Sequence, residues 1–209
     1  MSRPKILQEG QSYTFRSYFE MPYETDDILA EFGYSLSTQR LQLPTSSHLV
    51  SRLADFKAQL EASLQLVRLS SETARREILV APILLEVARI CHSQLRIEYP
   101  LTVNEQLKGK LDYLLRGPRN LLVIEAKNDD LSRGFTQLAV ELIALSKFED
   151  QSLLYGAVTL GNIWLFGQLN APDKMITQDL TLYRAPDDLE TLMAILVGII
   201  GLKNESLPA

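Results

Sequence analysis

Hydrophobic and polar residues follow two different periods along this chain, and the period changes near residue 44. Residues 11–21 (QSYTFRSYFEM) and 34–44 (YSLSTQRLQLP) alternate between apolar and polar positions, which is the period of a β-strand. Between them, residues 22–33 (PYETDDILAEFG) start at a proline, end at a glycine and carry acids early, as a short helix does. The pattern predicts a β-rich N-terminal extension over residues 1–69 that serves packing or recognition.

Longer helical and strand patterns follow. Apolar residues recur at helical spacing over residues 45–70 and again over residues 71–92, where Pro82 should kink or restart the helix. Strand patterns cover residues 95–103, 106–116, 121–126, 152–160, 163–169 and 174–184, and helical patterns cover residues 132–148 and 185–201. From residue 71 the order is helix, three strands, helix, strand. This order predicts an α/β domain over residues 70–209, with a mixed central sheet flanked by helices.

Composition narrows the class of protein. With 209 residues, 46% apolar and 22% charged, the chain can bury one sizeable core. Its one cysteine, Cys91, excludes an intrachain disulfide framework, so a reducing, cytoplasmic setting is expected. No apolar run approaches the ~20 residues of a membrane-spanning helix, and residues 1–10 lack the apolar core of a signal peptide. A membrane partner is therefore not expected.

The clearest chemical signal lies at the end of the most apolar strand, LLVIEAKNDD at residues 121–130. Residues two apart in a strand project from the same face, so Glu125 and Lys127 should point the same way and Ala126 the opposite way. Charges beside a hydrophobic sheet are unfavourable unless they have partners. Pairing between Glu125 and Lys127 would satisfy part of that need.

The preceding strand supplies a third charge, Asp112, within GKLDYLL. A hairpin through residues 116–120 (RGPRN) would bring Asp112 close to Glu125. Two adjacent carboxylates repel unless a proton or a cation lies between them. Mg²⁺, or Mn²⁺ in its place, would fit two carboxylates, water molecules and the carbonyl of Ala126. Lys127 would then orient or deprotonate a water molecule, or stabilise charge on a phosphate.

These residues resemble a known family. LD at 111–112 and IEAK at 124–127, within the predicted order of elements, are similar to the PD-(D/E)XK nuclease superfamily of restriction-endonuclease-like and RecB-like proteins. The resemblance spans roughly residues 71–168. It implies an αβββαβ core and Mg²⁺-dependent hydrolysis of phosphodiester bonds in DNA. Asp112 and Glu125 would match the metal ligands, and Lys127 the catalytic lysine.

Two further positions follow from the same resemblance. Many members carry a glutamate in the first core helix, for which Glu86 is the candidate, and RecB-like members carry a glutamine after the lysine, for which Gln137 is the candidate. The chain departs from the pattern at Leu111, where the family has proline, and at Glu141, where RecB-like members have tyrosine.

The bare triplet acid-x-Lys carries little information. A second copy, residues 55–57 (DFK), lies in a helical pattern, where residues two apart do not share a face. The alternative interpretation is that Glu125 and Lys127 form an exposed ion pair, which contributes only about 0–1 kcal/mol, and that Asp112 faces solvent. The main alternative function is an inactive nuclease-like fold that binds nucleic acid or assembles as a homodimer through its apolar last helix. A small-molecule metalloenzyme is a third option, supported by the carboxylates alone.

Overall fold

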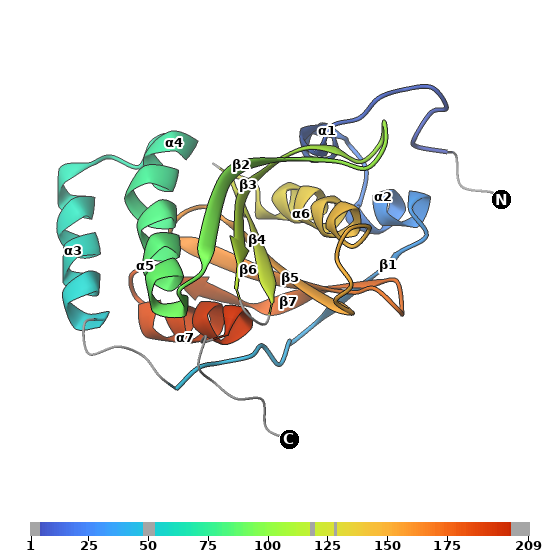
Figure 1. The fold of residues 1–209 in the computed structure, drawn as a ribbon. Helices are drawn as coiled ribbons and strands as arrows, with labels where there is room; N and C mark the ends of the chain where they lie inside the picture. The colour runs from blue at the N-terminus through green and yellow to red at the C-terminus, as the bar shows by residue number, and fades with distance from the viewer. Residues whose placement is uncertain (1–4, 48–52, 118–119, 128, 202–209) are drawn as a thin grey trace, which may run out of the picture.

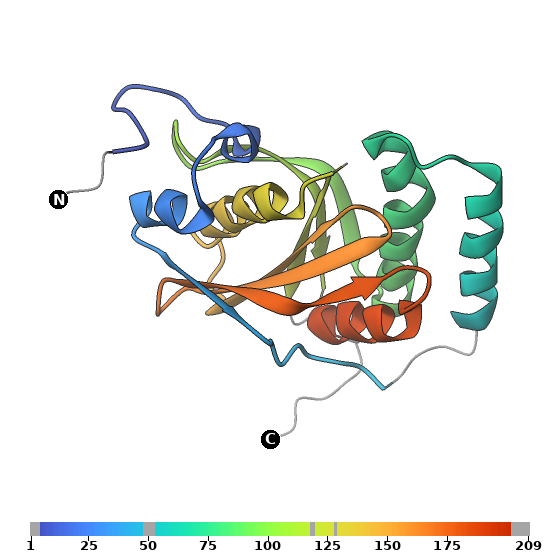
Figure 2. The same cartoon turned by 180° about the vertical axis from the view of Figure 1, so that it is seen from behind.

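The protein is an α/β structure built on one seven-stranded mixed sheet with helices on both faces (Figures 1 and 2). The computed structural model describes residues 5–47, 53–117, 120–127 and 129–201. The helices are α1 (Phe15–Glu20), α2 (Thr25–Glu31), α3 (Leu53–Leu66), α4 (Glu72–Arg75), the π-helical turn η1 (Arg76–Val80), α5 (Ala81–Cys91), α6 (Leu131–Leu145) and α7 (Leu189–Ile200). The strands are β1 (Ser35–Gln39), β2 (Gln94–Thr102), β3 (Lys108–Arg116), β4 (Leu121–Ala126), β5 (Leu153–Thr159), β6 (Ile163–Asn170) and β7 (Met175–Arg184).

The strand order in the sheet is β1-β7-β6-β5-β4-β3-β2. The pairs β4–β5 and β1–β7 are parallel, and the other neighbours are antiparallel. The chain needs a crossover to return in parallel from β4 to β5, and α6 provides it. The predicted order from residue 71 and the mixed sheet flanked by helices are both confirmed.

Two hydrophobic cores lie on opposite faces of the sheet. The first is covered by α1, α2 and α6, and the second by α5 and α7, with α3 as an outer helix (Figures 1 and 2). The alternation along β4 separates them: Val123 belongs to the first core, whereas Leu122 and Ile124 belong to the second. Because Glu125 has the same parity as Val123, its side chain projects on the α6 face.

The N-terminal prediction needs a correction. Residues 11–21 were expected to form a strand, but Phe15–Glu20 form the helix α1. Phe15 and Tyr18 are both buried, and this spacing of three places them on one side of a helix. Over so short a segment the apolar positions fit either period, and burial against α6 and β3 decides for the helix. The described part of the extension thus has three helices, α1, α2 and α3, and one strand, β1, and is not β-rich.

The extension is joined to the same sheet and core as the rest of the chain. β1 pairs in parallel with β7, with Ser35 opposite Met175. Phe15, Tyr18 and Ile28 are buried in the core that also contains Val123. Residues 5–39 therefore complete one face of the sheet and cover α6.

Pro82 restarts the long helix, as predicted. Immediately before it the helix widens into η1, where the Ala81 N–H donates to the carbonyl of Arg76, five residues back. A regular α-helix then runs from Ala81 to Cys91. Of the predicted turn between β3 and β4, residues 118–119 lie outside the described residues, and the Gly117 N–H donates to the Asn120 carbonyl at 2.9 Å.

The apolar last helix, α7, is buried in the chain's own fold. Leu192, Met193 and Leu196 are fully buried in the second core. A homodimer through this helix stays a prediction. Within the described residues, no helix has the length and apolar character needed to traverse a bilayer.

The packing of α7 against the segment after β1 makes Gly198 irreplaceable. The Ser46 N–H donates to the Ala194 carbonyl at 2.9 Å, and a Cβ on Gly198 would lie 2.5 Å from the Pro44 carbonyl oxygen. Glycine-to-alanine in a helix normally stabilises by ~0.5–1 kcal/mol. We expect Gly198→Ala instead to destabilise by about 1–3 kcal/mol, because backbone atoms cannot move aside as side chains do. Urea unfolding measures this, with the exposed Thr191→Ala in the same helix as control; an unchanged midpoint for Gly198→Ala would contradict the packing.

Candidate active site

Strands β3 and β4 bring Asp112 to the end of β4. Tyr113 is opposite Ile124, and continuing this antiparallel register by one residue in each strand places Asp112 opposite Glu125. The Ala126 N–H donates to Asp112 Oδ2 at 2.9 Å. The amide of Ala126 thus holds Asp112, and metal binding by the Ala126 carbonyl stays a prediction.

Lys127 and Glu125 form an ion pair inside the protein. The Lys127 amine contacts Glu125 Oε1, and the two side chains are only 11% and 2% exposed. The Lys127 backbone N–H donates to the Thr159 carbonyl at 2.8 Å, which fixes the lysine at the end of the sheet. The alternative of a solvent-exposed pair is therefore wrong. A buried pair requires further partners for its remaining polar atoms.

Helix α6 supplies one of those partners. Gln137 donates from Nε2 to Glu125 Oε1 at 2.7 Å and to Glu141 Oε1 at 2.9 Å. Gln137 and Glu141 are four residues apart on one helical face, and Glu141 is fully buried. Within the described residues, Glu125 Oε2, Gln137 Oε1 and Glu141 Oε2 are buried without a hydrogen-bond partner. Three unpaired acceptors in one cluster indicate a missing donor or cation.

The pKa values of the cluster also indicate a missing donor or cation. Burial raises the pKa of Glu125 to about 8, and the charge of Asp112 adds to this against the opposing effect of Lys127. Burial, then the charge of Glu125, raises the pKa of Glu141 well above that of an ordinary glutamate. Burial lowers the pKa of Lys127, but the carboxylates around it, Glu125 first, raise it by more. The acids thus favour an added positive charge, and the lysine stays protonated.

Asp112, Glu125, Lys127 and Gln137 all line one cavity of about 490 Å³. Its walls come from α1, the helical segment before Pro82, β3, β4 and α6. The lining includes Asp112, Glu125, Lys127, Gln137, Asp129, Glu72, Arg76, Lys110, Gly109, Thr14, Phe15, Arg16 and Phe19.

The donor set fits a magnesium ion with few protein ligands. Among the described residues Glu125 Oε2 is buried without a hydrogen-bond partner, and burial, followed by the charge of Asp112, raises the Glu125 pKa. Mg²⁺ in proteins keeps several waters and takes one or two carboxylates. In the part of the chain that the structure describes, no group of three or more His, Cys, Asp or Glu is arranged to hold a metal. The side-chain ligands of a cation here would be Asp112 and Glu125, and the Ala126 carbonyl and water molecules stay the expected further ligands.

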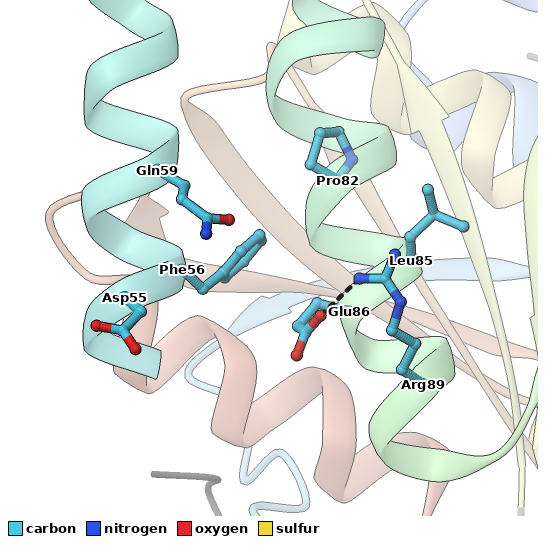
Figure 3. A pocket seen from close by; sticks show the side chains of 7 residues that line it. All are labelled: Asp55, Phe56, Gln59, Pro82, Leu85, Glu86 and Arg89. Atoms are coloured by element: carbon cyan, nitrogen blue, oxygen red, sulfur yellow. Dashed lines mark hydrogen bonds and ion pairs between the residues drawn. The ribbon is translucent and has the colours of Figure 1, made fainter. Parts of the chain in front are cut away.

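Glu86 does not join this cluster. It lies on α5 and pairs with Arg89 at 2.8 Å, where it lines a separate cavity between α3 and α5 with Asp55 and Phe56 (Figure 3). Figure 3 shows Glu86 directed toward α3. The residue of this helical segment that does approach the site is Arg76, whose Nη1 lies 3.5 Å from Asp112 Oδ1.

Three residues of the site were not found from the sequence. Arg76, the first residue of η1, contacts Asp112, and Phe19 lies on α1, with the Lys127 amine 4.7 Å from its ring centroid. No sequence pattern predicts either contact. Glu141 had a usable signal, because a glutamate four residues after Gln137 must share its helical face.

Models of known protein families produce no match to this chain, and no similar sequence was found among curated proteins. The chemistry of the protein therefore rests on the geometry of its site.

The buried carboxyls predict a pH dependence of stability. A glutamate whose pKa is raised on folding stabilises the fold at pH values below its unfolded pKa, ~4.3. That stability is lost as pH rises through the folded pKa, about 8 for Glu125. We expect the free energy of unfolding to fall between pH 5 and pH 9. Glu141→Gln keeps an acceptor for Gln137 and removes one acid, so at high pH it should stabilise by about 1–2 kcal/mol.

Chemical denaturation at several pH values measures this effect. Glu61→Gln, at an exposed position on α3, is the control and should follow the wild-type profile. A Glu141→Gln profile that runs parallel to wild type would show that Glu141 does not take up a proton on folding.

Proposed function

We propose that this protein is a metal-dependent nuclease that hydrolyses DNA phosphodiester bonds, with a core of the restriction-endonuclease-like αβββαβ type. One observation carries the proposal. Asp112, Glu125, Lys127 and Gln137, all matched to the PD-(D/E)XK pattern, line a single cavity although they come from three segments of the chain, β3, the end of β4 and α6. An acidic pair with an adjacent buried amine is suited to phosphoryl chemistry.

Asp112 and Glu125 would hold the metal ion. Bound Mg²⁺ or Mn²⁺ would polarise the scissile phosphate and lower the pKa of an attacking water molecule. Gln137 and Lys127 both contact Glu125 Oε1, which leaves Oε2 for the ion. The Ala126 N–H holds Asp112 through Oδ2. The carboxylates are thus oriented before any ion arrives, which limits reorganisation on binding.

Lys127 acts as a hydrogen-bond donor in this scheme. Its pKa is raised by the surrounding carboxylates, so the amine carries a proton and is unsuited to act as a base. A protonated amine donates a hydrogen bond to a lone pair of the water oxygen and so orients the water molecule. It also stabilises negative charge that develops on phosphate oxygens. Of the roles considered for this lysine, orientation and charge stabilisation are favoured over deprotonation.

The main alternative is a nuclease-like module that binds without cleaving. One observation supports it: the ion pair with Lys127 neutralises the buried Glu125 carboxylate without a metal. Titration calorimetry with Mn²⁺ separates the two functions. Binding that disappears in Asp112→Asn supports the nuclease, whereas no binding by wild type, together with a stable dimer in solution, supports the module.

Substitution in the cluster should abolish cleavage. We expect Asp112→Asn, Glu125→Gln and Lys127→Met each to lower the rate of plasmid and branched-DNA cleavage in Mg²⁺ or Mn²⁺ by about 10²–10³-fold, because each removes a charge that acts on the transition state. Gel assays measure the rates. The matched control is the other acid-x-Lys triplet, with Asp55→Asn and Lys57→Met on α3, which should cleave as wild type does. Equal cleavage by all five variants would rule out the proposed site.

Phe19 should support the reaction through Lys127. The contact between ring and amine is a cation–π interaction, which contributes about 0.5–2 kcal/mol and needs an aromatic face. We expect Phe19→Leu to lower kcat by about 2- to 30-fold with little change in KM, and Phe19→Tyr to retain activity. Steady-state kinetics on a labelled oligonucleotide measures both constants. Equal loss in the leucine and tyrosine variants would indicate that the ring only fills space.

A further inference from the structure

The reactive side chains lie on the floor of the cavity, not on a surface. Asp112 is 19% exposed, and Lys127 and Glu125 are less exposed still. The cavity of about 490 Å³ is within the ~300–1,000 Å³ range of pockets that enclose a small ligand, which matches a nucleotide of one strand. A scissile phosphate must therefore enter the cavity to meet these groups.

The walls are fixed in place. On α1, Phe15 is buried, and Tyr18, also buried, donates from its hydroxyl to the Gln106 carbonyl at 2.6 Å. Gly109 on β3, with φ +152°, lies so close to α1 that a Cβ there would be 2.7 Å from the Phe15 ring. Opening this wall would expose Phe15 and Tyr18 to water, so α1 stays in position when substrate binds.

The opposite wall presents a guanidinium with free donors. Arg76 Nε lies 3.4 Å from the Tyr113 hydroxyl, and Nη1 lies 3.5 Å from Asp112, with the guanidinium 5.2 Å from the Tyr113 ring centroid. Among the described residues no contact engages its Nη2, and the residue lines the cavity. A planar guanidinium held in this way is suited to bind a phosphate through two N–H groups. Arg16 and Lys110 lie on the same lining, with side chains 81% and 66% exposed, and each is paired with a glutamate, Glu20 and Glu98 respectively.

Building on the proposed nuclease function, we propose that the substrate is single-stranded DNA and that Arg76 binds its backbone phosphate beside the carboxylates. A flexible strand can bend one phosphate into a walled cavity, and positive charge with an aromatic side chain is the usual surface for such strands. A duplex is stiff and keeps its second strand beside every phosphate. The wall formed by α1 then holds the duplex backbone away from the floor. Arg76 is a catalytic residue in this scheme because it touches the substrate.

Cleavage of matched substrates tests the strand preference. Labelled oligonucleotides of one sequence are compared as a single strand, a blunt duplex and a duplex with a long single-stranded tail, in Mn²⁺. We expect the single strand and the tail to be cut at least tenfold faster than the blunt duplex. Equal rates on the single strand and the blunt duplex would overturn the inference while leaving the nuclease function intact.

Binding without metal tests the inference independently of catalysis. In EDTA, fluorescence anisotropy should show tighter binding of the single strand than of the duplex. Arg76→Gln should weaken binding of the single strand by about 10- to 100-fold, because a charge-assisted contact to phosphate is lost. Arg76→Lys should recover part of the affinity, and Arg89→Ala, at the exposed partner of Glu86, is the control and should bind as wild type.

The outcomes separate the two proposals. Preferential binding of the single strand that depends on Arg76, without cleavage of any substrate, would support the strand inference and contradict the nuclease. Equal affinity for both forms, or the same affinity in Arg76→Gln and Arg89→Ala, would overturn the strand inference. Circular dichroism of each variant confirms folding, and Arg76→Lys serves if Arg76→Gln does not fold.

Discussion

The buried ion pair between Glu125 and Lys127 is the constraint on which this site depends. Removing two charges from water is unfavourable, and their mutual attraction compensates only when the remaining polar atoms also have partners. Gln137 on α6 holds the carboxylate, and the carbonyl of Thr159 fixes the lysine backbone. The ring of Phe19 covers the amine from α1. Strand, crossover helix and N-terminal helix are therefore all fitted around two side chains at the end of β4.

The surroundings of α6 explain how so many polar groups came to be buried. Its sequence is that of an amphipathic helix, yet every residue from Gly134 to Leu145 is buried, because α1 and α2 cover the face turned away from the sheet. The described N-terminal segment is therefore required to exclude water from the cluster. Gln137 and Glu141, which an open sheet would leave solvated, are enclosed, and this burial raises the pKa of Glu141.

Features of the fold and the site that depend on neighbouring residues can be predicted from the sequence, whereas features that depend on contacts between distant segments cannot. The order of elements from residue 71 and the shared face of Glu125 and Lys127 depend on local periodicity, so the sequence predicts both. The helix α1 was mistaken for a strand because its choice between periods depends on contacts with α6 and β3. Arg76 could not be predicted, because its contact with Asp112 joins a helical segment to a strand 36 residues later and depends on tertiary packing. The family resemblance points to Glu86 only by its position in the first core helix, and α5 directs its side chain toward α3, away from the site.

The arrangement is difficult to explain as a means of stabilising the fold. A buried ion pair can often be replaced by apolar side chains of similar volume without loss of stability, and unpaired buried acceptors are unfavourable. Glu125 Oε2 and Glu141 Oε2 are both such atoms. If stability were the only requirement, replacing these acids with leucine would make the folded state more stable. Retaining them is reasonable where a positive charge binds among them. Of these two oxygens, only Glu125 Oε2 belongs to a residue that lines the cavity with Asp112 and Lys127. The other oxygen of that carboxylate, Oε1, already contacts Gln137 and Lys127, which leaves Oε2 for the positive charge.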